Sequence, residues 1–143
     1  MTPGASVAKF KRFWKLQENK TRSGIRSGYM ALRRDLVKEA RRLIKEPPKT
    51  GKLYKIPGRK RLHRASRAGE APAKLTGALG RSISAVQRGW DELHFGADTI
   101  YARRLELGGG NIAKRPYLLK AIENNERNAR GHFEREIERK LTI

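Results

Sequence analysis

The chain has 143 residues, of which 34 are Lys or Arg and 14 are Asp or Glu, so its formal net charge is +20. A chain of this length is expected to form a single domain, residues 1–143, with room for only a modest hydrophobic core. Cysteine is absent, which excludes a disulfide framework and a thiolate metal site. No segment has the apolar length of a signal peptide or a membrane span, so we expect no membrane partner and assembly on the cytosolic side.

The positive charge is concentrated in the first half of the chain. Residues 1–70 hold 21 basic and five acidic residues, whereas residues 71–143 hold 13 basic and nine acidic residues. A segment dense in one sign of charge repels itself and needs phosphate, an acidic protein surface or counterions. The sequence therefore predicts a molecule with two electrically different sides.

The N-terminal segment, residues 1–26, has apolar spacing that fits neither a helix nor a strand well. Residues 6–15 predict either a helical turn or an edge strand, and they contain the aromatic residues Phe10, Phe13 and Trp14. Such a cluster is typical either of a core or, in a ring-forming protein, of a segment that inserts into the neighbouring subunit.

Residues 27–46 give the clearest helical signal. Apolar residues such as Val37, Ala40 and Ile44 recur at steps of three and four and form one stripe. Ser27 is a candidate N-cap, and Pro47 and Pro48 cannot donate the next helical hydrogen bonds.

Residues 47–75 predict an extended basic arm, or alternatively a hairpin with a short strand at residues 53–56. The segment has no sustained period, and a 29-residue irregular loop in a compact domain is expected only where it is functional or partner-bound. Its charge is explained by a solvated face, by contacts with nucleic-acid phosphates, or by docking on an acidic protein. The candidate partner-facing or DNA-facing residues are Lys49, Lys52, Lys55, Arg59, Lys60, Arg61, Arg64 and Arg67.

The rest of the chain predicts a hairpin and two helices. Alternating residues at 83–88 and 92–95 indicate two strands, joined by a turn in which Gly89 supplies a positive φ angle. A short helix is expected over residues 99–107, and a long one begins near Pro116. The predicted fold is therefore α+β: a small antiparallel sheet packed against a helix in the N-terminal half and a C-terminal helix, with the extended basic arm.

No constellation of residues indicates an enzyme, a metal site or a cofactor. The three histidines, His63, His94 and His132, fall on different predicted elements and lack metal-ligand spacing. The run from Gly108 to Lys114 resembles a phosphate-binding loop but lacks the Gly before and the Ser or Thr after the lysine. We expect no catalytic activity, no metal and no cofactor.

An ordered set of short motifs lies between residues 71 and 116 and, together with the first predicted helix, covers about residues 30 to 125. An Ala-Pro pair is followed by Thr-Gly-x-Leu and Ser-Ile, then by Tyr-Ala, Leu-Glu-x-Gly and Arg-Pro. In this order and spacing the chain resembles the tail-completion, or minor tail, proteins of long-tailed bacteriophages. The residues that carry the resemblance are Pro72, Thr76, Gly77, Leu79, Ile83, Tyr101, Ala102, Glu106, Gly108, Arg115 and Pro116.

The resemblance implies a structural virion protein of the phage neck, which forms a homo-oligomeric ring at the head–tail junction. A hexamer is favoured and a dodecamer is possible. The implied partners are neighbouring neck or connector proteins, tail-tube or tail-terminator proteins, and packaged double-stranded DNA that passes through the channel. A free-standing basic nucleic-acid-binding protein is the alternative that the charge alone supports.

Overall fold

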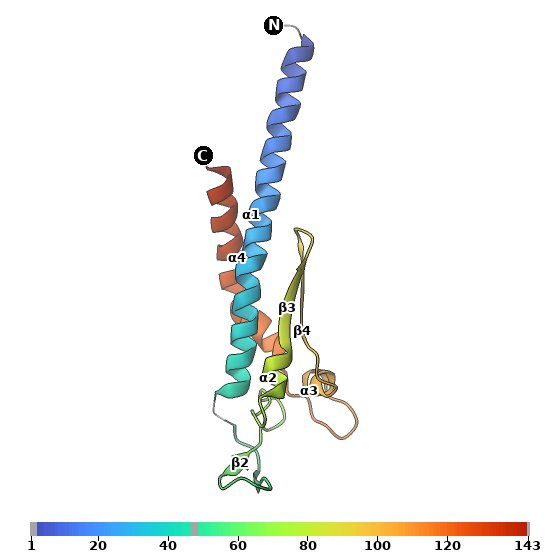
Figure 1. Cartoon of the computed structure of the whole chain (residues 1–143), viewed down its shortest axis with the longest axis vertical. Helices are drawn as coiled ribbons and strands as arrows, with labels where there is room; N and C mark the ends of the chain where they lie inside the picture. The colour runs from blue at the N-terminus through green and yellow to red at the C-terminus, as the bar shows by residue number, and fades with distance from the viewer. Residues whose placement is uncertain (1–2, 47–48, 143) are drawn as a thin grey trace.

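The computed structural model describes residues 3–46 and 49–142, which form an elongated α+β molecule (Figure 1). The predicted fold class is confirmed, with two small sheets of two strands each in place of one. The elements in chain order are α1 (Pro3–Lys45), β1 (Leu53–Lys55), β2 (Leu62–Arg64), α2 (Ala78–Ser82), β3 (Ile83–Arg88), β4 (Glu92–Ala97), α3 (Ala102–Leu107) and α4 (Leu118–Leu141).

Helix α1 is much longer than the sequence predicts. It begins at Pro3 and absorbs the N-terminal segment 1–26 as far as that segment is described, so Ser27 lies inside the helix and caps nothing. Proline is favoured in the first turn of a helix, where its missing N–H group costs no hydrogen bond. The expectation of a turn or strand at residues 6–15 was therefore wrong. The predicted stop at Pro47 and Pro48 falls outside the described residues.

Helices α1 and α4 lie against each other along much of α4 (Figure 1). Two glycines one turn apart allow this close approach. A methyl group on Gly24 would lie 2.7 Å from the Cα atom of Ile137, and one on Gly28 would lie 2.4 Å from the ring of Phe133. A polar pair extends the contact between the helices: the Nε2 atom of His132 on α4 lies 2.6 Å from the Oδ2 atom of Asp35 on α1.

The predicted hairpin is confirmed, and β3 and β4 pair antiparallel. Ile83 pairs with Ala97, and Arg88 pairs with Glu92. Gly89 has a φ angle of 62°, as the predicted turn requires. One face of β3 packs on α1 and buries Ile83 and Ala85.

The predicted extended arm at residues 47–75 is not what the structure shows. The alternative expectation of a hairpin is confirmed instead, since β1 and β2 pair antiparallel with Leu53 opposite Arg64. Gly58 turns the chain with a φ angle of 79°. The return segment then packs onto the body, where Ser66, Ala71 and Pro72 are buried.

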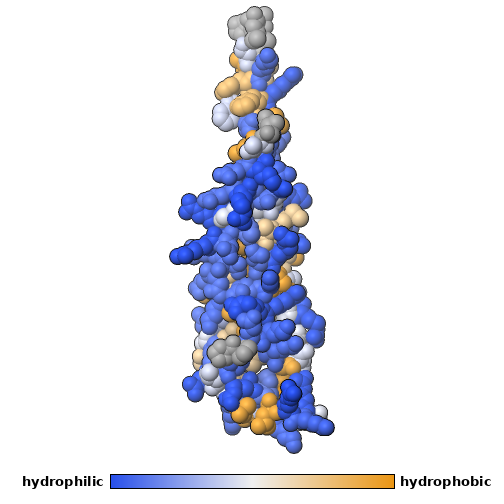
Figure 2. Space-filling view, turned by 90° about the vertical axis from the view of Figure 1, so that its left-hand side faces the viewer, coloured by the Kyte–Doolittle hydropathy of each residue, from blue (hydrophilic) through white to orange (hydrophobic). Residues whose placement is uncertain are grey.

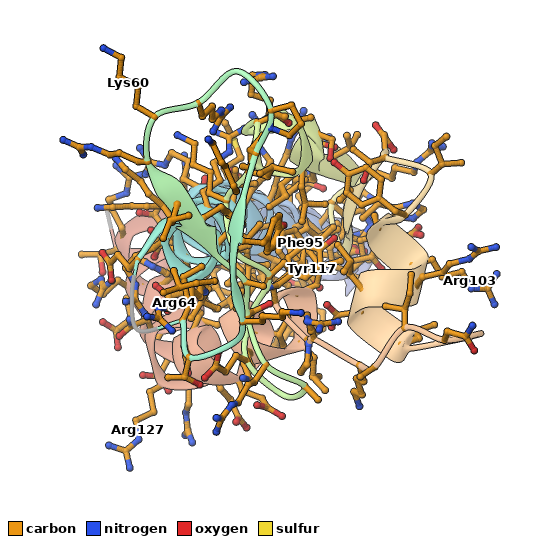
Figure 3. The ribbon with its side chains drawn as sticks, turned by 90° about the horizontal axis from the view of Figure 1, so that it is seen from below. Lys60, Arg64, Phe95, Arg103, Tyr117 and Arg127 are labelled. Atoms are coloured by element: carbon orange, nitrogen blue, oxygen red, sulfur yellow. The ribbon has the colours of Figure 1, made fainter. Side chains whose placement is uncertain are left out.

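The hydrophobic core lies at the end of the molecule near this hairpin. It joins α1 to α2, β3, α3 and the start of α4, and Tyr117 is its largest fully buried side chain. Phe95 packs against the same cluster and lies close to Tyr117 in the view from below (Figure 3). In the described part of the chain, no helix has the length and apolar character needed to cross a membrane.

Candidate functional site

The basic hairpin of β1 and β2 stands at one end of the molecule and presents the predicted basic residues to solvent. Lys60 lies on its loop and points away from the body (Figure 3). The side chains of four residues are exposed and make no hydrogen bond or ion pair within the described chain; these residues are Lys52, Lys55, Lys60 and Arg61. They form the outward basic set of the hairpin.

Two arginines of the hairpin have structural roles in addition to their charge. Arg59 donates to the carbonyl oxygen of Leu75 at 3.1 Å, and Arg64 donates to that of Gly51 at 3.1 Å. These bonds tie the hairpin to the segments that precede and follow it.

Lys49 does not belong to the outward set. Its ammonium group donates to the carbonyl oxygens of Leu43 at 2.6 Å and Ala71 at 2.9 Å, so it joins the end of α1 to the return segment. Burial lowers its pKa below the ordinary lysine value. The structure thus places the predicted site residue Lys49 at this junction, where its local sequence does not reveal the two carbonyl partners.

Glu70 closes the base of the hairpin. Its carboxylate accepts hydrogen bonds from the hydroxyl and the backbone N–H of Thr50 and from the backbone N–H of Arg67 at 2.9 Å. These bonds stabilise the ionised form and lower the pKa of Glu70 to about 2. Of the predicted basic residues, Arg67 therefore contributes its backbone here, while its side chain is exposed.

The two faces of the hairpin differ. On one face, Tyr54 and His63 lie directly opposite each other, with ring centroids 5.2 Å apart. They line a cavity of about 540 Å³ together with Leu75 and Tyr101. On the other face, Leu53 and Leu62 are exposed.

The motif residues 72–83 form the return segment, the turn before α2, helix α2 itself and the start of β3. Gly77 has a φ angle of 84°, and the Oγ1 atom of Thr76 accepts from the N–H of Ala78 at 3.3 Å. This turn opens α2, which buries Leu79, and β3 follows at once with Ile83. These residues therefore shape the turn into α2 and β3, and Pro72, Thr76, Gly77 and Leu79 also line the cavity beside Tyr54 and His63.

The motif residues 101–116 join α3 to the start of α4. Both carboxylate oxygens of Glu106 accept hydrogen bonds from the first backbone N–H groups of α4, from Tyr117 at 2.8 Å, Leu118 at 3.0 Å and Leu119 at 2.9 Å. Such groups have no partner inside a helix, so Glu106 acts as the cap of α4 from another element. Gly108, with a φ angle of 75°, is the C-cap residue that follows the last residue of α3, Leu107.

Arg115 connects the same junction to the hairpin. Its backbone N–H donates to Leu105 at 2.6 Å, and its guanidinium donates to the carbonyl oxygen of Ser66 at 3.3 Å. Pro116 follows and lies just before the N-cap residue Tyr117. Among the other motif residues, Ala102 is buried in the core and Tyr101 is half-exposed beside the cavity. The motifs thus hold the base of the basic hairpin in place.

Two further surfaces lie on α1; the aromatic residues of the first stood out in the sequence, whereas the second was not predicted from it. The first is the apolar end of α1, where Val7, Phe10, Phe13 and Trp14 are all more than half exposed. Figure 1 shows that this part of α1 extends past the end of α4, and Figure 2 shows apolar side chains there. The second is a row of basic residues on the other half of α1, which the spacing of Arg34, Lys38, Arg41 and Lys45 could have revealed.

The histidines do not come together into a site. His94 pairs with Glu92, and His132 pairs with Asp35 on α1. Within residues 3–46 and 49–142, no three His, Asp or Glu side chains are grouped so that they could hold a metal ion.

Comparisons with protein-family models, with curated proteins and with solved structures give no match to this chain.

Proposed function

We propose that this chain is a structural subunit of a bacteriophage neck or tail, which forms a ring at the head–tail junction and contributes to tail completion and head–tail joining. The observation that carries the proposal is the exposed apolar end of α1, because a helix end with several aromatic side chains in water is stabilised by burial in an assembly. The ordered motifs of residues 72–116 support the same family.

The apolar end of α1 continues a face that is already used for helix packing. The same side of α1 carries Phe10, Trp14 and Gln17 and then Gly24 and Gly28, because these positions are separated by three, four or seven residues. Helix α4 covers this side at the two glycines, and α1 runs on beyond the end of α4 (Figure 1). In a homo-oligomeric ring, a second copy of the chain would cover this apolar end of α1.

The basic hairpin is the second contact of the proposed subunit, at the opposite end of the molecule (Figure 1). In a ring, the outward set Lys52, Lys55, Lys60 and Arg61 faces acidic loops of a neighbouring connector, tail-tube or tail-terminator protein, or packaged DNA in the channel. A hexamer brings together a charge of about +120, which requires such anionic neighbours. A hexamer is the favoured order and a dodecamer the alternative.

The test is the mass of the nuclease-treated protein in solution, measured by light scattering at moderate salt, alone and with connector or tail-tube protein. We expect a discrete ring for the unchanged chain. The double substitution F10Q/W14Q should shift the mass to that of the monomer, because the buried aromatic area is lost. The matched control is L16Q, which removes an exposed apolar side chain from the other side of α1 and should leave the ring intact.

A ring that survives F10Q/W14Q would overturn the role of the apolar end. An unchanged chain that stays monomeric with every neck partner, and binds nucleic acid with a steep salt dependence, would instead assign it to the free-standing nucleic-acid-binding proteins.

A further inference from the structure

A basic groove of about 690 Å³ runs between the C-terminal half of α1 and strand β3. The ion pair of Arg42 and Glu46 also lines the groove. We define the basic groove by the other cations that line it from α1: Arg33, Arg34, Lys38, Arg41 and Lys45. It lies on the body of the molecule and is separate from the basic hairpin.

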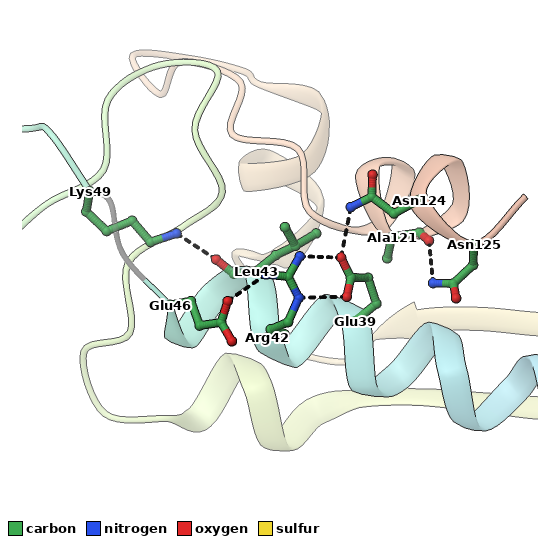
Figure 4. A network of polar contacts seen from close by, with 8 residues as sticks. All are labelled: Glu39, Arg42, Leu43, Glu46, Lys49, Ala121, Asn124 and Asn125. Atoms are coloured by element: carbon green, nitrogen blue, oxygen red, sulfur yellow. Dashed lines mark hydrogen bonds and ion pairs between the residues drawn. The ribbon is translucent and has the colours of Figure 1, made fainter. Parts of the chain in front are cut away.

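The acid that lines this groove, Glu46, is paired with Arg42, and the acids Asp35 and Glu39 of α1 are not among its lining residues. Asp35 and Glu39 are on the side of α1 that faces α4, where Asp35 pairs with His132 and Glu39 accepts from Asn124 at 2.8 Å (Figure 4). Glu39 and Glu46 both bind Arg42, at 2.6 Å each, so these two carboxylates are already paired (Figure 4).

The cations of the groove are therefore available to an external anion. In the described chain no ion pair or side-chain hydrogen bond engages Arg33, Arg34, Lys38 or Lys45. Arg41 differs, because its guanidinium donates to the carbonyl oxygens of Gly80 at 2.9 Å and Ile83 at 3.2 Å. These acceptors are uncharged, so they hold the guanidinium in place over the groove without neutralising its charge.

The apolar residues that line the groove are Val37, Ile83 and Ala85. Ile83 is 1% exposed and Ala85 is 9% exposed, so an amphipathic protein segment would find its hydrophobic contacts at half-buried Val37 and at the side-chain stems of the rim. No aromatic side chain lines the groove among the described residues, so it provides no platform for stacking unpaired bases. The cations are therefore the main recognition groups of the groove, and this favours a duplex backbone.

The spacing of the cations fits a row of phosphates. Arg34, Lys38, Arg41 and Lys45 follow one another at steps of four, three and four, which places them on one side of the helix. From Arg34 to Lys45 the helix rises about 16 Å. Duplex DNA carries one phosphate per roughly 3.4 Å of axis on each strand, so about five phosphates of one strand span the same distance.

We propose that the basic groove between α1 and β3 binds the phosphate backbone of double-stranded DNA without reading its sequence. The proposal rests on the placement of these cations and holds for a single subunit as well as for a ring. It assigns DNA to the body of the molecule and leaves the hairpin for contacts with neighbouring proteins.

The experiment measures binding of a fluorescein-labelled DNA duplex of about 20 base pairs by anisotropy, between about 50 and 200 mM salt. The groove variant is R34Q/K38Q/K45Q, which keeps good helix formers and spares Arg41. We expect at least about a tenfold loss of affinity and a salt slope lower by up to about 2.7, since each lost phosphate contact removes about 0.9.

The matched control is R103Q/K114Q/R127Q, which removes the same charge from exposed positions on α3, the following loop and α4. Arg103 and Arg127 point away from the body in Figure 3. We expect affinity within about twofold of the unchanged protein, because screening weakens charges that lie farther than a Debye length from the bound backbone.

An equal loss in both variants would overturn the groove as a site, because net charge would then explain the binding. An unchanged affinity of the groove variant would do the same. A groove variant that loses binding to poly-glutamate but not to the duplex would reassign the groove to an acidic protein. Circular dichroism confirms that each variant is folded, and the light-scattering mass tests ring formation independently.

Discussion

At the scale of single residues, Glu106 has the most consequential side chain of the motif set. Its carboxylate accepts from three consecutive backbone N–H groups at the start of α4, although it belongs to α3. Capping carboxylates also interact favourably with the positive end of the helix dipole. Glu106 therefore links the order of the motifs in the sequence to the placement of the C-terminal helix.

We expect the substitution E106A to lower the free energy of unfolding by about 1–2 kcal/mol, because the cap of α4 is lost. Urea denaturation followed by far-UV circular dichroism measures the change. The control E123A removes an exposed carboxylate from α4 that makes no bond in the described chain, and it should change stability by less than about 0.5 kcal/mol. Equal effects of the two substitutions would contradict the capping role.

Tyr117 presents the opposite situation, since its hydroxyl is buried and has no hydrogen-bond partner among the described residues. A buried polar group without a partner destabilises the folded state. We expect Y117F to raise the free energy of unfolding at pH 7 by up to about 1 kcal/mol, as measured in urea. A loss of stability in this variant would mean that the hydroxyl has a partner in solution.

The same residue predicts a pH dependence. Burial, and then the charge of Glu106, raise the pKa of Tyr117 to about 12, from an ordinary value of 10.0. Because the folded state favours the neutral phenol, this contribution to stability is present below pH 10 and is lost as the pH rises to about 12. The stability advantage of Y117F over the unchanged protein should therefore grow between pH 10 and 12, in melting curves.

At the scale of elements, the crossing of α1 and α4 depends on small side chains. Added at Gly24, a methyl group would collide with the backbone of Ile137, which cannot move away as a flexible side chain does. We expect G24A to lower the free energy of unfolding by about 1–3 kcal/mol despite the better helix propensity of alanine. The change is measured by urea denaturation.

The control for this prediction is G131A on α4. There the nearest atom to an added methyl group is the Nη1 atom of Arg135, at the end of a flexible side chain. Alanine should therefore stabilise α4 at this position by about 0.5–1 kcal/mol. A G24A protein as stable as G131A would show that the helices are farther apart than described.

Local signals predicted the elements well where they were strong. The alternation at residues 83–88 and 92–95 and the turn at Gly89 predicted the β3–β4 hairpin, and the helical stripe predicted the second half of α1. The first half of α1 was missed because its aromatic residues are more than half exposed and contact one another rather than a buried face, so no amphipathic pattern marks them as helical.

The contacts at the candidate site could be predicted only in part. The basic charge of residues 47–69 was visible in the sequence. The inward orientation of the Lys49 side chain was not, because it depends on the carbonyl oxygens of Leu43 and Ala71, and Ala71 is 22 residues away. Likewise, Glu106 entered the motif set by resemblance, while its role as a cap appears only once α3 and α4 are placed together. Contacts of this kind arise from tertiary structure and leave no local pattern.

At the scale of the whole molecule, the most prominent property is the excess of positive charge. The chain has 34 basic and 14 acidic residues, so most basic side chains have no acid to pair with. Mutual repulsion among them opposes the compact state and is screened by salt over a Debye length of about 10 Å at 0.1 M.

We therefore expect the melting temperature to rise as sodium chloride is raised from about 20 to about 300 mM, since screening relieves repulsion more than it weakens the few surface ion pairs. Circular dichroism melting curves measure this. A melting temperature that falls over the same range would show that the ion pairs, such as those of Arg42, outweigh the repulsion.

The continuous course of α1 has a mechanical consequence. Its 43 residues span about 64 Å, and no proline occurs after the first of them to introduce a kink. The aromatic end and the end beside the basic hairpin are thus joined by one stiff rod (Figure 1). Such a rod fixes a distance: the separation between the partner bound at the aromatic end and the partner bound at the hairpin end is set by the number of residues in α1. Insertion or deletion of helical turns would lengthen or shorten that distance by about 5.4 Å per turn.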